Sequence, residues 1–194
     1  MENDLRVQII LGSTRDGRSG EKVGNWIHNL ALKRKDFTTE FIDLKDWDIK
    51  FIHDVNPPSI GKYSDPIVQK WAEKIDEADA YIIVTPEYNH GYPAVLKNAL
   101  DVIYKEWNNK PVTFVSYGGF VGGSRSVEQL RQVAVELQMA PIREAIFIPF
   151  IWQAFNEDGN LKNEEDYNKR VESMFNQLVW WANALKNAKG QTTN

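Results

Sequence analysis

The chain has 194 residues, of which 42% are apolar and 26% charged, values typical of a single globular domain, which we expect over residues 1–194. The net charge of −4 is neither the strongly basic balance that suggests nucleic acid as a partner nor the strong acidity of a docking electron carrier. The lack of cysteine excludes disulfides, thiolate metal sites and cysteine nucleophiles. The three histidines lack metal-site spacing, no apolar run approaches the ~18 residues of a membrane span, and MENDLRVQ does not resemble a signal peptide, so we expect a cytoplasmic protein without metal or membrane contact.

Short apolar runs alternate with helix-period segments along the chain. The runs predict five strands, at residues 7–11, 37–44, 80–84, 111–117 and 142–149. Apolar residues at i, i+3, i+4 and i+7 predict helices around residues 23–30, 65–78, 93–103, 127–137 and 171–185. The stretch from Lys45 to Ser64 is predicted to be a long irregular loop. This alternation is typical of a doubly wound α/β fold with a parallel sheet.

Doubly wound sheets bind ligands outside the carboxyl ends of their strands, and the loop after the first strand has the composition of a phosphate site. Glycines at its start, middle and end permit a tight turn whose N–H groups converge, and the next helix directs its positive dipole end to the same place. The side-chain donors of this loop are those of Ser13, Thr14, Arg15, Arg18 and Ser19. We therefore expect this loop to bind a phosphate group.

The phosphate loop nearly matches a second pattern, that of a nucleotide-binding P-loop. GSTRDGRS fits GxxxxGK[ST] except that Arg18 occupies the lysine position. A P-loop enzyme also needs a magnesium-binding aspartate at the end of a second strand, where this chain has Thr85-Pro86-Glu87. The glycine spacing does not fit the dinucleotide pattern GxGxxG either. A magnesium-dependent nucleotide module stays as an alternative hypothesis.

The loops after the third and fourth strands could form the remaining walls of a site. Residues 85–93 combine two stiffening prolines with Tyr88 and Tyr92, which can form a flat wall for a ring. Residues 116–125 contain paired glycines that let the backbone approach a ligand closely. Whether His90 or Tyr92 contacts the ligand is left open.

The segments LGSTRDGRSGEKVGNWI, TPEYNHGYPAVLKNALD and VSYGGFVGGSRSVEQLR resemble the NADPH-dependent FMN reductases, a family that includes quinone, azo-compound and chromate reductases. The resemblance covers roughly residues 5–150. It implies a flavodoxin-like three-layer fold, with a five-stranded parallel sheet in the order 2-1-3-4-5, and FMN at the carboxyl ends of the strands. The family's cofactor-binding positions fall here on Ser13, Arg15, Arg18, Ser19, Gly20, Glu21, Pro86, Glu87, Tyr88, Asn89, Ser116, Tyr117, Gly118 and Gly119.

The resemblance also implies a reaction and an assembly. NAD(P)H would deliver a hydride to FMN, and a small-molecule acceptor such as a quinone, azo compound, free flavin or chromate would then take two electrons in a ping-pong sequence. The family forms homodimers or homotetramers with FMN near the interface. We assign no catalytic residue, because the flavin performs the chemistry and a loop carboxylate such as Glu87 more often bonds to nearby backbone.

A flavodoxin-type electron carrier without its own NAD(P)H chemistry is the alternative function. Carriers tend to be strongly acidic, whereas this chain has a net charge of −4 and arginines at positions 15 and 18 of its phosphate loop. The acceptor, the preference for NADPH or NADH, and the choice between dimer and tetramer are not readable from the sequence.

Overall fold

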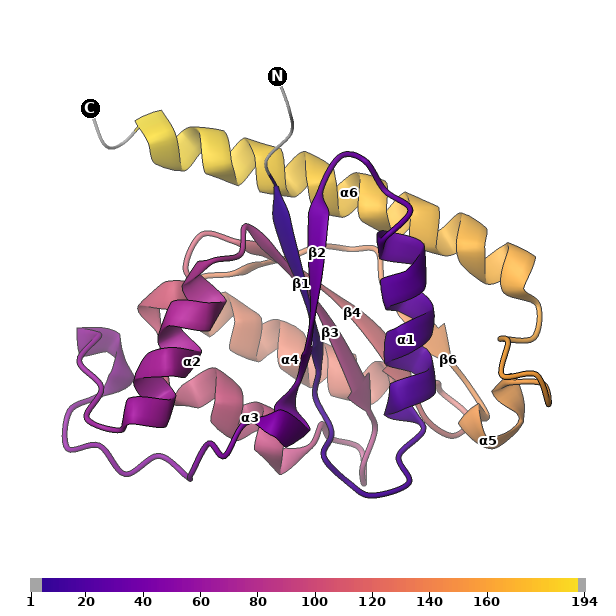
Figure 1. Cartoon of the computed structure of the whole chain (residues 1–194), viewed down its shortest axis with the longest axis horizontal. Coiled ribbons are helices and arrows are strands. Elements are labelled where there is room, and N and C mark those ends of the chain that lie inside the picture. The colour runs from indigo at the N-terminus through magenta and orange to yellow at the C-terminus, as the bar shows by residue number, and fades with distance from the viewer. Residues whose placement is uncertain (1–4, 192–194) are drawn as a thin grey trace.

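The computed structural model describes residues 5–191, which form a parallel sheet between two layers of helices (Figure 1). The strands are β1 (Arg6–Leu11), β2 (Thr38–Asp43), β3 (Ala80–Pro86), β4 (Pro111–Tyr117), β5 (Ala140–Pro141) and β6 (Ile146–Ile148). Their order is β2-β1-β3-β4-β5, and β6 also pairs with β4. The predicted α/β class and strand order are therefore confirmed, with a sixth strand in addition. The predicted domain of residues 1–194 includes residues 1–4 and 192–194, which lie outside the described residues.

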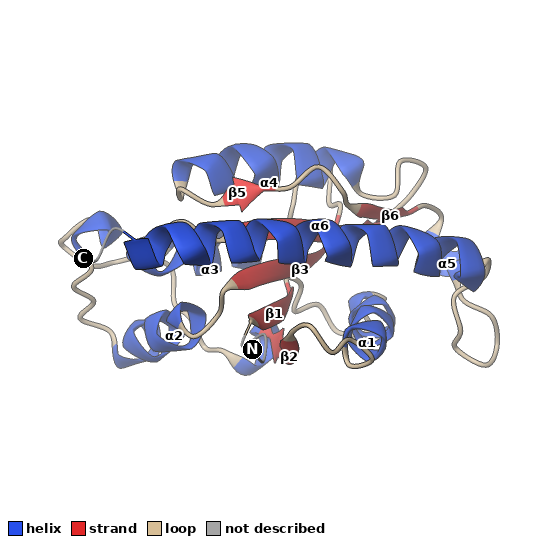
Figure 2. Cartoon of the chain, turned by 90° about the horizontal axis from the view of Figure 1, so that it is seen from above, coloured by secondary structure: helices blue, strands red, loops and turns tan. Residues whose placement is uncertain are grey.

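Six α-helices are described within this part of the chain, and three short 3₁₀ turns accompany them. The helices are α1 (Gly20–Ala31), α2 (Pro66–Asp76), α3 (Ala94–Asp101), α4 (Ser124–Glu136), α5 (Ile151–Ala154) and α6 (Glu164–Gln191). The turns are η1 (Leu44–Asp46), η2 (Pro58–Ile60) and η3 (Lys105–Trp107). Helix α6 runs along most of the long axis of the molecule (Figure 2). No helix among residues 5–191 is both long and apolar enough to cross a membrane.

Strand alternation divides the core into two layers. On β1, Val7, Ile9 and Leu11 pack with α1 and α6, whereas Ile10 faces the layer of α2, α3 and α4. Because successive side chains point to opposite faces, a strand covered by helices on both sides must be apolar throughout. This explains why the central strands are near-continuous apolar runs, and it confirms the sandwich of three layers.

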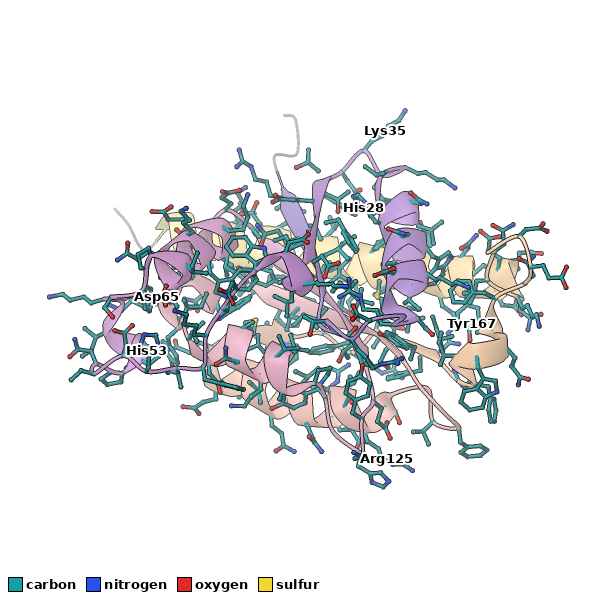
Figure 3. The ribbon with its side chains drawn as sticks, turned by 60° about the horizontal axis from the view of Figure 1, so that its bottom comes forward. His28, Lys35, His53, Asp65, Arg125 and Tyr167 are labelled. Carbon is teal, nitrogen blue, oxygen red and sulfur yellow. The ribbon has the colours of Figure 1, made fainter. Side chains whose placement is uncertain are left out.

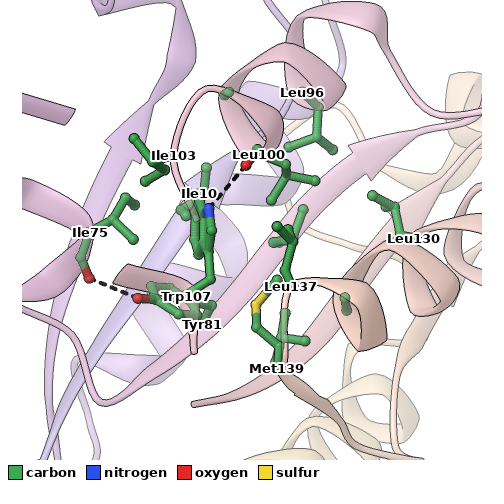
Figure 4. Packing of buried hydrophobic residues seen from close by; sticks show 14 of the residues in the cluster. Ile10, Ile75, Tyr81, Leu96, Leu100, Ile103, Trp107, Leu130, Leu137 and Met139 are labelled. Carbon is green, nitrogen blue, oxygen red and sulfur yellow. Dashed lines mark hydrogen bonds between the residues drawn. The ribbon is translucent and has the colours of Figure 1, made fainter. Parts of the chain in front are cut away.

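An aromatic cluster fills the core beneath α2 and α3. Trp71 lies with its ring centroid 6.3 Å from that of Trp107, which is 4.9 Å from that of Tyr81, both in edge-to-face arrangements. Their polar atoms are satisfied, since Trp107 Nε1 donates to Leu100 O at 3.1 Å and the Tyr81 hydroxyl donates to Ile75 O at 2.7 Å (Figure 4). Large rings thus add packing without leaving a buried donor unpaired.

A buried lysine stands immediately before β4. Lys110 is 5% exposed, and its ammonium donates to the last carbonyls of α2, at 3.1 Å to Ile75 O and 3.2 Å to Asp76 O. It therefore satisfies acceptors that a helix end leaves without an intrahelical partner. Burial lowers the pKa of Lys110 to about 8, although nearby Asp76 opposes this effect.

The predicted fifth strand at residues 142–149 was wrong in extent, because the edge of the sheet is split into β5 and β6. At Glu144 the N–H donates to Gln177 Oε1 at 2.8 Å, and the carbonyl accepts from the Thr113 hydroxyl at 2.6 Å. The side chains of Gln177 and Thr113 thus bond the backbone of Glu144, which would otherwise pair with the backbone of β4. Pro141, which has no N–H, ends β5 just before this break.

Candidate functional site

The loops after β1, β3 and β4 meet at the carboxyl edge of the sheet, at the bottom of Figure 1. They enclose a cavity of about 220 Å³. The cavity is lined by Arg15, Arg18, Ser19, Pro86, Glu87, Tyr88, Tyr117, Gly118, Gly119, Ile151 and Trp152. Three segments that are far apart in the sequence therefore form one site, at the place where a doubly wound sheet binds its ligand.

Most of the predicted site residues line this cavity, but some do not. Those outside its lining are Ser13, Gly20, Glu21, Asn89 and Ser116. Two lining residues were not predicted, Ile151 and Trp152, both on the short helix α5. Their segment follows the last strand, and its only signal in the sequence is the aromatic pair Phe150 and Trp152 at a strand–helix junction.

The first loop presents unpaired backbone donors beside the start of α1. The N–H groups of Ser13, Thr14, Arg15, Ser19 and Gly20 donate to no hydrogen bond within residues 5–191. The side chain of Arg15 is exposed and likewise makes no ion pair in this part of the chain. Free N–H groups at a helix N-terminus, together with a free guanidinium, have the chemistry that suits an anion.

Gly20 lets the start of α1 approach the floor of the site. A Cβ at this position would collide with the Tyr117 hydroxyl and lie 2.8 Å from Leu11 Cδ1. The hydroxyls of Ser13 and Tyr117 lie 3.2 Å apart, and both residues are buried. Burial raises the pKa of Tyr117 to about 12, so its hydroxyl stays protonated and can donate a hydrogen bond. Ser13 and Gly20 thus shape the site from beneath the lining.

Arg18 is held by the protein itself. Its guanidinium donates to Asp43 Oδ1 at 2.9 Å, to Glu21 Oε1 at 3.2 Å, and to the second carboxylate oxygen of Asp43 and the carbonyl of Ser13. Burial lowers the pKa of Arg18, but its bonds with Asp43 and Glu21 outweigh that effect, so the pKa lies above its usual value. Glu21 contributes to the site as a partner of Arg18.

The loop after β3 ends in a tight turn. Tyr88 and Gly91 exchange two backbone hydrogen bonds, of 2.8 and 3.0 Å, and the residues between them, Asn89 and His90, both have positive φ. This is the geometry of a type I′ turn, which asparagine at its first central position favours. Asn89 and His90 therefore stand at the tip of the turn, away from the cavity, while Tyr88 lines it.

Helix α4 holds the loop after β3 (residues 85–93, the tyrosine loop) in place. The hydroxyl of Ser126 lies 3.0 Å from Pro86 O and 2.7 Å from Gly91 O, and it is buried. Glu87 Oε1 accepts from Arg125 Nη1 at 2.8 Å, and Glu87 Oε2 accepts from the backbone N–H of Arg125 at 3.3 Å. Arg125 lies at the lower edge of the molecule in Figure 3. A carboxylate engaged in this way fastens a loop, and this engaged Glu87 occupies the place after β3 where a P-loop enzyme would hold its magnesium-binding aspartate.

The loop after β4 (residues 116–125, the glycine loop) depends on left-handed backbone at the start of α4. Gly123 has φ +85, and a Cβ there would lie 2.8 Å from Ser116 Cβ and 2.9 Å from Tyr117 N. The hydroxyl of Ser116 donates to Gly122 O at 2.8 Å and closes the loop. Ser116 thus shapes the wall that Gly118 and Gly119 form, with its own side chain turned away from the cavity.

An aromatic rim extends from the cavity to the surface. Trp152 is 70% exposed, and its ring centroid lies 5.7 Å from that of Phe150, which lies 5.9 Å from that of Phe120. The backbone of this segment is fastened to the glycine loop, because Phe150 N donates to Gly119 O and Ile151 N to Gly118 O, each at 3.0 Å. Exposed aromatic side chains beside a cavity are typical of a surface that receives a flat ligand.

Comparison with known proteins identifies the family. The model of the NADPH-dependent FMN reductase family matches residues 5–153. The chain belongs to this family. Its members use FMN with NAD(P)H as the electron donor, so this protein is an NAD(P)H-dependent FMN oxidoreductase.

Individual relatives agree with this identification of the reductase. An NAD(P)H-dependent FMN reductase of Schizosaccharomyces pombe is 38% identical over 148 residues, covering 74% of each chain. A quinone reductase of Escherichia coli is 30% identical over 155 residues, covering 76% of this chain and 79% of its own. The solved structure of FerB, a flavoenzyme NAD(P)H:(acceptor) oxidoreductase of Paracoccus denitrificans, has a TM-score of 0.73 at 23% identity and covers 93% of this chain and 98% of its own. The predicted flavodoxin-like fold is thereby confirmed.

Proposed function

We propose that FMN binds in the cavity at the carboxyl edge of the sheet, and that the enzyme transfers electrons from NAD(P)H to a small-molecule acceptor, with a quinone as its best substrate class. The observation that carries this proposal is the convergence of an unpaired anion-binding loop, a rigid tyrosine loop and a glycine loop on one cavity. An FMN molecule needs a site for its phosphate next to a slot for its ring, and these loops supply both.

The phosphate would be held by the first loop. The free N–H groups from Ser13 to Arg15 and at Ser19 and Gly20 offer neutral donors, and α1 adds its positive dipole end. Arg15 supplies the positive charge, since no other group in residues 5–191 engages its guanidinium. Replacing Arg15 by alanine should therefore weaken retention of FMN more than it changes the rate of hydride transfer in the reconstituted enzyme.

The ring would lie between the other two loops. Pro86, Glu87 and Tyr88 form one wall, and Gly118 and Gly119 form the other, where the missing side chains leave room for a flat molecule. FMN, when bound, accepts a hydride from NAD(P)H and gives two electrons to the acceptor. The protein positions the ring and shields it from water, and no side chain in the cavity is required as a general acid or base.

Trp152 would face the incoming acceptor. Its indole is the most exposed aromatic group in the lining, and an aromatic ring stacks well on a flat conjugated molecule such as a quinone. Because both the reductant and the acceptor must reach the same ring, we propose a ping-pong sequence in which one product leaves before the next substrate binds. A quinone reductase of Escherichia coli among the relatives supports this substrate class.

The experiment is an anaerobic reduction of the purified, FMN-loaded protein. The protein should bind FMN in a one-to-one ratio, NADPH or NADH should bleach the flavin rapidly, and addition of a quinone should restore the colour. A colourless protein that ignores added FMN would overturn the proposal. Slow bleaching together with a stable one-electron state would favour the electron-carrier alternative. The cytoplasmic location and a homodimer or homotetramer with FMN near its interface remain proposals.

A further inference from the structure

Arg18 has no donor left for a ligand. A guanidinium carries five N–H groups, and the structure gives each of them an acceptor in the protein. Nε and Nη2 donate to Glu21 Oε1, Nη1 donates to Ser13 O and Asp43 Oδ1, and Nη2 also donates to Asp43 Oδ2. Arg18 is 5% exposed although it belongs to a surface loop. Its position in the loop suggests phosphate binding, whereas its contacts show a group that is already saturated.

These contacts link the phosphate loop to the neighbouring strand. Leu11 and Asp43 are register partners at the carboxyl ends of β1 and β2, so the loop leaves the sheet directly beside the carboxylate. Arg18 joins this carboxylate to the carbonyl of Ser13 at the start of the loop, while Arg18 itself stands near its end. Arg18 thereby connects the start and the end of the phosphate loop to Asp43, at the end of β2.

The arginine also fixes the direction of the loop's free donors. In a trans peptide the C=O of one residue and the N–H of the next point in opposite directions. Because Arg18 holds the carbonyl of Ser13, the N–H of Thr14 in the same peptide unit points away from Arg18. Arg15, two residues after Ser13, is exposed and has no ion-pair partner among residues 5–191. The two arginines therefore have different tasks, although they stand three residues apart in one motif.

We propose that Arg18 and Asp43 form a positioning pair that preorganises the phosphate loop, and that Arg18 does not itself bind the phosphate. Asp43 lies outside the cavity lining, at the end of the edge strand β2. The pair acts through the loop, because a preformed site does not lose binding energy in ordering itself around the ligand. This inference rests on the proposed binding of FMN.

The test compares FMN with riboflavin, which lacks the phosphate, on the full-length protein. Dissociation constants are measured from flavin fluorescence for Arg18→Met, Asp43→Asn and the double variant. The amide oxygen introduced by Asp43→Asn can still accept from Lys45 N, as Asp43 does at 2.9 Å, so this variant keeps the start of η1. Arg18→Lys provides a folded charge-conserving variant should methionine at this position prevent folding.

The structure provides a matched control at the other end of the sheet. Arg34 Nε donates to Asp36 Oδ1 at 2.9 Å in a half-buried pair that precedes β2. Lys35, between these two residues, lies at the opposite end of the molecule from Arg125, whose guanidinium pairs with the cavity-lining Glu87 (Figure 3). Asp36→Asn should lower the unfolding midpoint much as Asp43→Asn does, without changing either dissociation constant.

We expect Arg18→Met and Asp43→Asn each to weaken FMN binding at least about tenfold, and riboflavin binding less than about twofold. The double variant should bind FMN no more weakly than the weaker-binding single variant, because the two side chains act as one unit. Unchanged FMN affinity in Asp43→Asn alongside a large loss in Arg18→Met would show that Arg18 binds the phosphate directly. A lower unfolding midpoint with unchanged FMN affinity in both would reduce the pair to a structural role. If the unaltered protein binds no FMN, the proposed function fails instead.

Discussion

Replacing Lys110 by methionine should change how the stability of the protein depends on pH. The ammonium is buried between α2 and β4, where it bonds the terminal carbonyls of α2 and lies 3.1 Å from the Tyr81 hydroxyl. Burial lowers the pKa of Lys110 from 10.5 to about 8 in the folded protein. Methionine fills a similar volume without a titratable group, so the variant lacks this contribution.

The sign follows from the two pKa values. Between about pH 8 and pH 10.5 the unfolded chain binds the proton that folded Lys110 has released, so the stability of the unaltered protein rises with pH across this window. Below pH 8 both states carry the proton, and the cost of burying the charge is fully present. The full shift corresponds to about 3 kcal/mol at ~1.4 kcal/mol per pKa unit, of which about 2 kcal/mol falls between pH 7 and pH 9.5.

Urea unfolding at several pH values, followed by circular dichroism, measures this effect. The free energy of unfolding of the unaltered protein, minus that of Lys110→Met, should increase by about 2 kcal/mol from pH 7 to pH 9.5. The exposed Lys169, which pairs with Glu165 at 2.9 Å, is the control, and its methionine variant should differ by a constant of less than ~1 kcal/mol. A constant difference for Lys110→Met as well would refute the lowered pKa and the reasoning from burial.

Three further variants test the loops of the site. Gly123→Ala should lower the free energy of unfolding by about 2–4 kcal/mol, because alanine would have to adopt left-handed backbone and place its Cβ 2.8 Å from Ser116 Cβ. A thermal melting curve identical to that of the unaltered protein would contradict this strain. Ser126→Ala should cost about 1–2 kcal/mol and weaken FMN binding, since the buried hydroxyl that links helix α4 to the carbonyls of Pro86 and Gly91 is lost. Unchanged flavin affinity would mean that the tyrosine loop needs no such support. Trp152→Ala should raise the KM for a quinone several-fold and leave the rate of flavin reduction by NADPH within about twofold of the unaltered protein. The control is Trp180→Ala, which removes another exposed tryptophan. Equal effects of the two variants on the quinone KM would remove Trp152 from the acceptor site.

Much of the site could be predicted because the position of each strand along the chain and the composition of the loop after it are local properties of the sequence, whereas the order of the strands in the sheet came from the family resemblance. The run from Val7 to Leu11 marks a buried strand, and its direct continuation into glycines, hydroxyls and arginines marks a phosphate loop. The contribution of α5 could not be predicted, since nothing local shows that Trp152 folds back against Gly119.

The sequence by itself determined the order of strands and helices, the loops that face the ligand and the family, because periodicity and motif composition are carried by neighbouring residues. Only the tertiary structure decided what each side chain in those loops does. Arg15 and Arg18 look alike in the motif, yet the carboxylate of Asp43, 25 residues beyond Arg18, binds Arg18, whereas no carboxylate in the described part of the chain pairs with Arg15. The break between β5 and β6 has the same origin, since side chains from β4 and α6 bond the backbone there. Such partners are brought together by the pairing of strands and the packing of helices, and that information is not contained in any local pattern.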